Sequence, residues 1–232
     1  MKTDRYSRQT MLDGFGEEGQ RRLAQSRVLI AGAGGLGSAA AIYLAGAGVG
    51  HIAVADADTV SLSNLQRQVL YSEAEVGRPK AACAAARLHA LNSDVCIEPI
   101  DTFITSDNAS TLLQGRDIVL DCTDNFATRY IIDDACAAAS IPWIYASIGE
   151  FEGQLSLFGG NSGTRYADLY PDREALCSRP RTVAGVLGAV PGVLGAMQAA
   201  EAVKYLLGMG ENLDGRLLCI NLLTFDTSLI KL

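Results

Sequence analysis

Several features that mark other protein classes are absent from this sequence or rare in it. Aromatic residues make up 6% of the 232 positions, proline occurs 6 times, and there are 2 histidines, His51 and His89. No apolar stretch reaches the roughly 18 uninterrupted residues of a membrane-spanning helix. The amino-terminal residues are polar where a secretory signal would be apolar. We therefore expect a soluble, cytoplasmic protein with no membrane partner.

Basic residues are also scarce. The chain has 19 Lys and Arg against 26 Asp and Glu, which gives a formal net charge of −7, and it contains no long run of Lys or Arg. Nucleic-acid-binding proteins commonly carry a basic patch that neutralises phosphates. A nucleic-acid partner is therefore disfavoured.

The 6 cysteines include no C-x-x-C pair. A zinc site built from paired cysteines is therefore not expected. Cys177 lies in a polar segment beside Arg179 and Arg181, whose charges would favour a thiolate if they lie close to it. The others fall mostly in apolar contexts, where we expect them to behave as small hydrophobic residues: Cys83, Cys96, Cys122, Cys136 and Cys219.

The chain is organised around a glycine-rich turn. An apolar run over 28–31 predicts a buried strand, and a helix-favouring Ala-rich segment begins at Ser38. Between them, a G-x-G-x-x-G turn lets backbone N–H groups approach a phosphate at a helix N-terminus. A second predicted strand, 51–55, leads to Asp56, at the spacing of an acid that accepts from ribose hydroxyls. We expect a nucleotide site that includes Gly32, Gly34, Gly35, Gly37 and Asp56.

The fingerprint alone does not identify the nucleotide. NAD and FAD are its usual ligands, so an NAD(P)-dependent dehydrogenase is one interpretation. Such an enzyme needs further catalytic groups and a substrate domain, and neither histidine lies at the tip of a predicted strand. The residues that follow Asp56 instead suit a polyphosphate: Asn64, Arg67 and Lys80.

The rest of the pattern predicts an α/β, Rossmann-like fold. We expect helices near 16–25, 79–92, 107–113 and 126–139, and buried strands over 95–100, over 117–125 with a polar tip, and over 142–147. Residues 151–158 alternate as an antiparallel strand does. The mainly parallel sheet should then be extended by antiparallel strands near 216–222 and 224–231, after a long helix that starts near Pro191. Residues 159–182 show no periodicity, which indicates a mobile or functional loop.

Polar residues end the strand that begins at Asp117. Ligands bind at such carboxyl ends in open α/β sheets. Asp124 could hold Mg²⁺ through its carboxylate. Alternatively, it could cap the helix that follows.

Six motifs together resemble the ThiF/MoeB/HesA family of ubiquitin-activating-type adenylyltransferases, which activate sulfur-carrier proteins in thiamine and molybdopterin synthesis. They read RYSRQ at 5–9, GAGGLGS at 32–38, DADTVSLSNLQRQ at 56–68, GRPKA at 77–81, LDCTDN at 120–125 and AGVLG…PGVLGAMQAAEAVKYLLG from 184 to 208. The resemblance covers nearly the whole chain. It implies one domain over 1–232, with a nucleotide-binding core at 27–147 and a carrier-binding half at 148–232.

The resemblance implies that ATP and Mg²⁺ are used to adenylate the C-terminal glycine of a small ubiquitin-like carrier protein that ends in Gly-Gly. It also implies a homodimer in which Arg8 acts in trans on the partner's ATP. Asp124 would bind Mg²⁺. The remaining implied nucleotide contacts, besides the glycine turn, are Asp56, Asp58, Asn64, Arg67, Lys80 and Asn125.

The sequence departs from the family pattern in two places. Many relatives carry two C-x-x-C pairs that bind a structural zinc, whereas residues 164–170 and 225–232 contain no cysteine here, so zinc should be absent and packing alone should hold this region. Relatives often have a reactive cysteine where this chain has Arg181. Cys177, four residues earlier, is either a sulfur-transfer or thioester residue, or incidental. A non-catalytic binding subunit is a third interpretation, which the full set of phosphate and metal residues disfavours.

Overall fold

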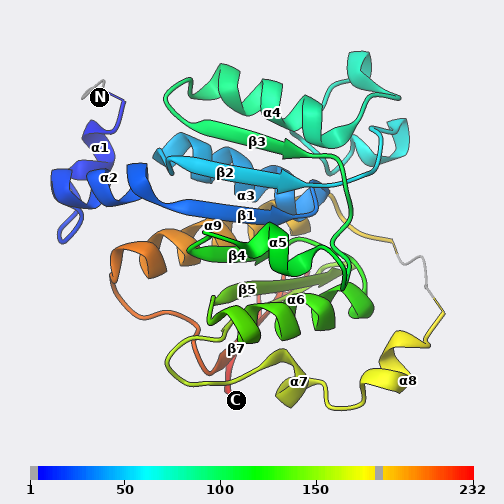
Figure 1. The fold of residues 1–232 in the computed structure, drawn as a ribbon. Helices are drawn as coiled ribbons and strands as arrows, with labels where there is room; N and C mark the ends of the chain where they lie inside the picture. Colours follow the sequence, from blue (N-terminus) through cyan, green and yellow to red (C-terminus); the bar gives the residue numbers. More distant parts are fainter. Residues whose placement is uncertain (1–4, 181–184) are drawn as a thin grey trace.

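An eight-stranded mixed sheet forms the centre of the molecule in the computed structural model, which describes residues 5–180 and 185–232 (Figure 1). The strand order is β3-β2-β1-β4-β5-β6-β7-β8. The first five strands in this order are parallel, and β6, β7 and β8 are antiparallel to their neighbours. This confirms the expected Rossmann-like α/β sheet with an antiparallel extension. The strands are β1 (Arg27–Ala31), β2 (His51–Ala55), β3 (Cys96–Ile100), β4 (Ile118–Asp121), β5 (Trp143–Gly149), β6 (Glu152–Phe158), β7 (Arg216–Asn221) and β8 (Thr227–Lys231).

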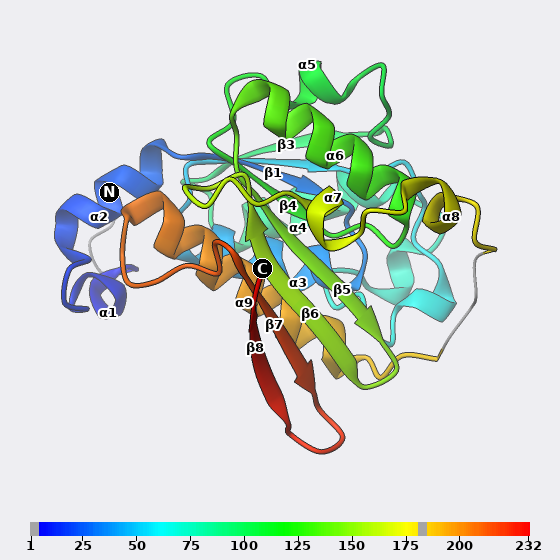
Figure 2. The same cartoon turned by 90° about the horizontal axis from the view of Figure 1, so that it is seen from below.

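Helices cover both faces of the sheet and form two apolar cores (Figures 1 and 2). The core on one face includes residues of α2 (Gly16–Gln25), α3 (Gly35–Ala47), α4 (Lys80–Leu91) and α9 (Ala189–Leu207). The core on the other face includes residues of α5 (Ala109–Leu113), α6 (Phe126–Ala139), α7 (Tyr166–Leu169) and α8 (Arg173–Cys177). The short helix α1 (Ser7–Thr10) and the 3-10 turns η1 (Leu62–Asn64) and η2 (Glu73–Glu75) complete the described elements.

Two glycines allow α3 to lie where it does. A Cβ on Gly37 would lie 2.0 Å from the carbonyl oxygen of Gly32, so any larger residue would push α3 away from the turn. A Cβ on Gly195 would lie 2.3 Å from the carbonyl oxygen of Leu36, so α9 packs directly on the backbone of α3. The small residues of α9 therefore allow it to pack closely on α3.

Residues 159–180 are more regular than the sequence predicts, because they contain α7 and α8. Tyr166 is fully buried, and its ring lies in an aromatic cluster with the rings of Trp143 and Tyr145, at centroid distances of 5.8 and 5.3 Å. The expectation of a segment without secondary structure is therefore wrong for this part. Residues 181 and 182 lie outside the described residues.

Ion pairs as well as packing hold this segment to α6. Arg165 donates to Asp133 at 2.9 Å and to Asp134 at 2.8 Å, and Arg173 donates to Asp134 at 2.6 Å. An Asp133 carboxylate oxygen also accepts from the backbone N–H of Tyr166 at 3.1 Å. The expectation that packing alone holds the region is therefore wrong.

The expectation for the cysteines holds only in part. Cys83, Cys122 and Cys136 are buried, whereas Cys219 is half-buried and Cys96 is exposed. Cys96 begins β3, which lies at one edge of the sheet beside β2. Hydropathy of the surrounding residues does not reveal such an edge position.

No helix within residues 5–180 and 185–232 combines the length and apolar character needed to cross a membrane.

Candidate functional site

Three parallel strands end at the same level at one edge of the sheet. Ala31 of β1 is in register with Ala55 of β2 on one side and with Asp121 of β4 on the other. The loops that follow these three strands therefore start side by side, where open α/β sheets bind ligands. They are the glycine turn after β1, the loop beginning at Asp56 and the tip that contains Asp124.

The glycine turn is pressed against the tip of β4. Gly32 has a φ of +97°, which favours glycine, and a Cβ there would lie 2.8 Å from the carbonyl oxygen of Cys122. A Cβ on Gly35 would lie 2.9 Å from two ring carbons of Pro191. The turn thus leads into the N-terminus of α3, whose backbone N–H groups attract anions.

Asp56 supports the turn from within the protein. Only 6% of this residue is exposed, and its carboxylate accepts from the N–H of Ala33 at 2.7 Å and from the N–H of Asp58 at 2.8 Å. Burial raises the pKa of the Asp56 carboxyl above its ordinary value, although these two donors and the charge of Lys80 counteract the rise. Asp56 directly follows β2, at the strand end where a ribose would bind. Its role toward a ribose stays a prediction.

The loop over 61–71 packs on the glycine turn. The Tyr71 hydroxyl donates to the carbonyl oxygen of Ala33 at 2.8 Å. A Cβ on Gly35 would lie 3.4 Å from the carbonyl oxygen of Arg67. Arg67 is half-buried and donates to the carbonyl oxygen of Ser63 at 3.3 Å, and Asn64 is also half-buried. Both predicted phosphate-binding residues thus belong to the loop that packs on the turn.

Sequence reasoning missed Gln68, which lies in the same loop. This side chain is 4% exposed, and its Oε1 atom has no hydrogen-bond partner among the described residues. Its Nε2 atom lies 3.7 Å from where a Cβ of Gly34 would be. A buried polar atom without a partner beside the turn marks Gln68 as a candidate ligand-binding residue. The sequence signal was its place in the DADTVSLSNLQRQ motif.

Lys80 is the first residue of α4 and 3% exposed. Its ammonium donates to a carboxylate oxygen of Asp58 at 2.9 Å, and its N–H donates to the Asp58 carbonyl oxygen at 2.9 Å. A further backbone bond joins the two segments, because the N–H of Val60 donates to the carbonyl oxygen of Arg78. These contacts hold a buried cation at the edge where β2 ends.

The tip of β4 presents an acid in front of a capped helix. Asp124 is exposed, and Asn125 is the N-cap of α6, since its side chain accepts from the N–H of Thr128 at 2.8 Å. The alternative that Asp124 caps this helix is therefore wrong. Mg²⁺ in phosphoryl-transfer sites is commonly held by one or two carboxylates and the substrate phosphates. One exposed acid beside the glycine turn fits that arrangement. Within the described residues, no cluster of three or more potential ligands would hold a metal without a substrate.

Arg8 lies far from this edge. It is exposed on α1, whose neighbouring residue Gln9 donates to the carbonyl oxygen of Ala47, the last residue of α3, at 2.9 Å. The glycine turn is at the other end of α3, and a 13-residue helix is roughly 20 Å long. Figure 1 shows α1 and α2 at the amino ends of the strands. Arg8 therefore does not belong to the site of its own chain.

Cys177 is exposed and is the last residue of α8. Of the two arginines expected beside it, Arg179 is exposed and Arg181 lies outside the described residues. The structure places Cys177 on the segment that the Arg165 and Arg173 ion pairs hold to α6.

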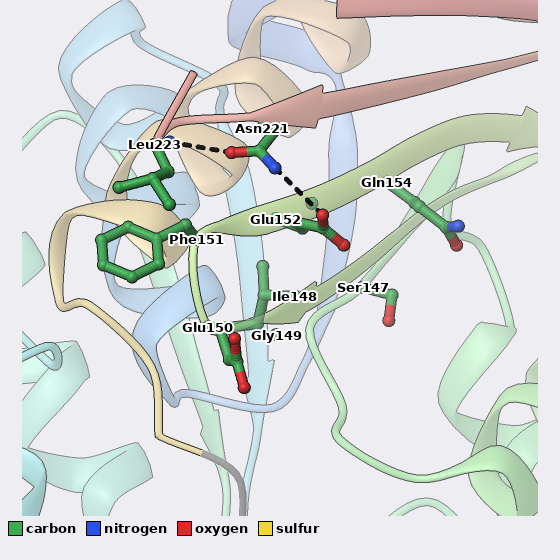
Figure 3. Close-up of a pocket in the computed structure, with 10 residues that line it drawn as sticks. Ser147, Ile148, Gly149, Glu150, Phe151, Glu152, Gln154, Asn221 and Leu223 are labelled. Atoms are coloured by element: carbon green, nitrogen blue, oxygen red, sulfur yellow. Dashed lines mark hydrogen bonds between the residues drawn. The ribbon is translucent and has the colours of Figure 1, made fainter. Parts of the chain in front are cut away.

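A pocket of about 460 Å³ lies beside this edge, at the β5–β6 hairpin (Figure 3). The N–H of Glu150 donates to the carbonyl oxygen of Gly185, and a Cβ on Gly188 would lie 2.1 Å from the carbonyl oxygen of Gln66. Residues 185–188 thus run from this hairpin to the loop that packs on the glycine turn. The pocket is lined by residues of β5, β6 and β7 and their turns: Ser147, Ile148, Gly149, Glu150, Phe151, Glu152, Gly153, Gln154, Asn221 and Leu223.

Together, the sheet and this edge define a Rossmann-like nucleotide-binding protein. Comparison with known families makes the class specific, because the model of the ThiF family matches residues 6–232. The chain belongs to the ThiF family.

Relatives with assigned names agree with this membership. The chain is 46% identical over 231 residues to the SAMP-activating enzyme E1 of Haloferax volcanii, covering 97% of this chain and 84% of the relative. It is 44% identical over 221 residues to the sulfur carrier protein adenylyltransferase of Thermus thermophilus, covering 93% and 82%. It is 47% identical to the adenylyltransferase and sulfurtransferase MOCS3 of Culex quinquefasciatus, where the match covers 92% of this chain but only 49% of the relative.

Solved structures support the fold. The crystal structure of E. coli MccB with MccA-N7isoASN superposes with a TM-score of 0.86 and covers 100% of this chain and 72% of that chain. At 23% identity, this likeness concerns the fold alone.

Proposed function

We propose that this protein uses ATP to activate the C-terminal glycine carboxylate of a small ubiquitin-like sulfur carrier as an acyl-adenylate, releasing pyrophosphate. The observation that carries the proposal is the gathering of the glycine turn, the Lys80–Asp58 pair and the Asp124 tip at one edge of the sheet, in a member of the ThiF family. Relatives named sulfur carrier protein adenylyltransferase and SAMP-activating enzyme E1 support the substrate class.

The chemistry requires two anions to meet, because a carboxylate must attack the α-phosphate. Lys80 and Arg67 are two cations at this edge, and they would offset the phosphate charge as it develops in the transition state. Mg²⁺ held by Asp124 and by phosphate oxygens would supply further positive charge. The attacking carboxylate is already ionised near pH 7, so the site needs no general base.

The pocket at the β5–β6 hairpin suits the end of the carrier chain. It opens beside residues 185–188, which run toward the loop over the glycine turn. Its lining combines backbone and polar side chains with the apolar side chains of Ile148, Phe151 and Leu223. Asn221 donates to Glu152 at 3.0 Å within the lining (Figure 3). An extended chain ending in Gly-Gly is narrow enough to reach the α-phosphate from this side, because glycine carries no side chain.

We also propose a homodimer, since Arg8 lies at the opposite edge from the site of its own chain and only a second copy could bring it to the nucleotide. Gel filtration tests this, with a mass near twice 24.5 kDa expected and a monomer contradicting it. The carrier's pathway would be thiamine or molybdopterin synthesis. The dehydrogenase interpretation is not retained, because the chain belongs to the ThiF family.

Exchange of labelled pyrophosphate into ATP tests the proposed function. The assay contains the protein, Mg²⁺ and a panel of sulfur carriers ending in Gly-Gly. Exchange is expected with a carrier of the correct pathway, and deletion of that carrier's last glycine should abolish it. A protein that neither binds ATP nor supports exchange with any carrier of the panel would instead favour a non-catalytic binding subunit.

A further inference from the structure

A buried arginine holds the strand tip that carries Asp124. Arg129 projects from the first turn of α6 and is 6% exposed. Its Nε atom donates to a carboxylate oxygen of Asp121 at 3.2 Å, and Asp121 is fully buried. Two carbonyl oxygens also accept from its Nη2 atom, that of Thr123 at 3.0 Å and that of Ala146 at 3.3 Å. One guanidinium therefore joins the tip of β4 to β5.

The neighbours of Arg129 restrict its position. Its guanidinium carbon lies 5.2 Å from the ring centroid of Tyr145 and 6.0 Å from that of Phe126, at cation–π distance. Asp121 also fixes the next turn of the chain, because it accepts from the N–H of Thr123 at 3.0 Å and from its hydroxyl at 2.6 Å. The arginine, the aspartate and the threonine backbone thus form one closed set of hydrogen bonds.

The opposite face of the sheet holds the same tip. Gln198 of α9 is fully buried, and its Nε2 atom donates to the carbonyl oxygens of Asp121 at 2.7 Å and of Ile144 at 3.2 Å. The end of β4 is therefore fixed from both sides, by Arg129 through Thr123 and by Gln198 through Asp121. Of these two side chains, Arg129 is the one that holds the residue directly before Asp124.

We propose that Arg129 is a positioning residue for the candidate nucleotide site: its bonds to Asp121 and to the carbonyl oxygen of Thr123 set where the Asp124 carboxylate lies. The inference rests on the proposed function, in which Asp124 meets the metal of Mg²⁺–ATP. Arg129 itself contacts only protein atoms. Groups that orient a ligating carboxylate change metal affinity without touching the metal.

The test uses the double variant Arg129→Met with Asp121→Asn. Removing Arg129 alone would leave a buried carboxylate without its partner and risk unfolding the protein. In the double variant, the side-chain oxygen of the introduced asparagine would still accept from Thr123, whereas the bonds to the carbonyl oxygens of Thr123 and Ala146 are lost. The matched control is Arg165→Met with Asp133→Asn, which removes a second arginine paired with a buried aspartate of α6, about one helical turn beyond Arg129, and leaves every bond to the tip in place.

Two measurements are made on each protein. Calorimetry gives the Kd for ATP with Mg²⁺ and with a chelator, and hydrogen exchange without nucleotide reports on the amides of 121–126. In the Arg129 double variant we expect the Kd with Mg²⁺ to rise about tenfold or more while the Kd with chelator stays within about threefold. Its amides at the tip should exchange about tenfold faster, and the control should show neither change.

The outcomes separate the two proposals. Wild-type protein that does not bind ATP would contradict the proposed function, and the exchange rates at 121–126 would still decide the role of Arg129. Unchanged exchange at the tip in a folded Arg129 double variant would overturn the inference. Equal weakening of ATP binding with and without Mg²⁺, or the same effect in the control, would also overturn it, because either result indicates general destabilisation.

Discussion

The ammonium of Lys80 lies 2.9 Å from a carboxylate oxygen of Asp58, although 4% of the lysine side chain and 57% of the aspartate side chain is exposed. The pair is thus open to solvent on the aspartate side alone. A phosphate that binds at this edge can replace Asp58 as the partner of the ammonium. The displaced carboxylate is then solvated, because most of its side chain is already exposed. The pair is therefore suited to hold a cation ready for an anionic ligand.

Lys80→Ala should abolish adenylation while leaving the fold intact. Pyrophosphate exchange is expected to fall about 100-fold or more, because a charge that stabilises the transition state is lost. Thermal unfolding should show a loss of about 1 to 3 kcal/mol, because the buried stem of the lysine is removed although the solvated Asp58 loses little. Arg116→Ala is the matched control, since Arg116 also pairs from an 11% exposed side chain with a 54% exposed acid, Glu98. Comparable loss of exchange in both variants would contradict the role of Lys80.

The ion pairs of Asp134 should make stability depend on pH. Burial acts to raise the pKa of this carboxyl, but hydrogen bonds from Arg173 and Arg165 outweigh it and lower the pKa below its ordinary value. A lowered pKa in the folded state contributes stability above the unfolded pKa of about 3.9, and the contribution is lost as the pH falls through the folded pKa. Because Asp134 is 51% exposed, the contribution should be at most about 1 kcal/mol.

Melting curves of wild-type protein and Asp134→Asn, recorded from neutral to strongly acidic pH, test the prediction. The wild type should be the more stable at about pH 5 to 7, and the difference should disappear as the pH falls through the folded pKa of Asp134, below its ordinary value. Raising the salt concentration should also shrink it. A difference of equal size at every pH would show that the aspartate acts through packing instead of charge.

Gly195→Ala should destabilise the packing of α9 on α3. The new Cβ would lie 2.3 Å from the carbonyl oxygen of Leu36, so the helices must separate at a cost of about 2 to 4 kcal/mol. Gly192→Ala is the control on the same helix, because a Cβ there meets nothing within 4 Å and should be neutral or stabilising by up to about 1 kcal/mol. Urea unfolding measures both. Equal effects of the two substitutions would show that the contact with Leu36 is relaxed easily.

Cys177→Ala separates adenylation from later sulfur chemistry. The thiol is exposed at the end of α8 and has no place among the described residues that line the nucleotide edge. Mass spectrometry of the carrier measures both products. Acyl-adenylate formation is expected to be unchanged, while thiocarboxylation of the carrier is expected to fall about tenfold or more. Full thiocarboxylation by the variant would assign Cys177 no role, and Cys96→Ala controls for loss of another exposed thiol.

The nucleotide edge could be predicted from the sequence because local spacing determines it. The distance from the glycine turn to Asp56, and the polar residues directly after β4, follow from strand and helix lengths that hydropathy reveals. Gln68 was missed because its burial depends on the loop folding back over Gly34. The sequence left Asp124 open between Mg²⁺ binding and capping α6, since an aspartate side chain can do either. It did not reveal that Asn125 is the residue that caps the helix.

The segment that contains α7 and α8 could not be predicted in the same way. Its order depends on partners more than 30 positions earlier in the chain, Asp133 and Asp134, and on the insertion of Tyr166 among aromatic rings from β5 and β6. Such contacts leave no periodic trace in the segment itself. The exposure of Cys96 has a similar origin, because the order of strands in the sheet decides which strand lies at the edge.

The position of Arg8 at the far end of α3 has a consequence for genetics. If each site takes Lys80 from one subunit and Arg8 from the other, two null alleles that alter these residues would complement each other. In a random mixture of Arg8→Ala and Lys80→Ala subunits, half of the dimers pair one of each, and one of the two sites in such a dimer is intact. Two inactive proteins would then recover about a quarter of the wild-type activity on mixing.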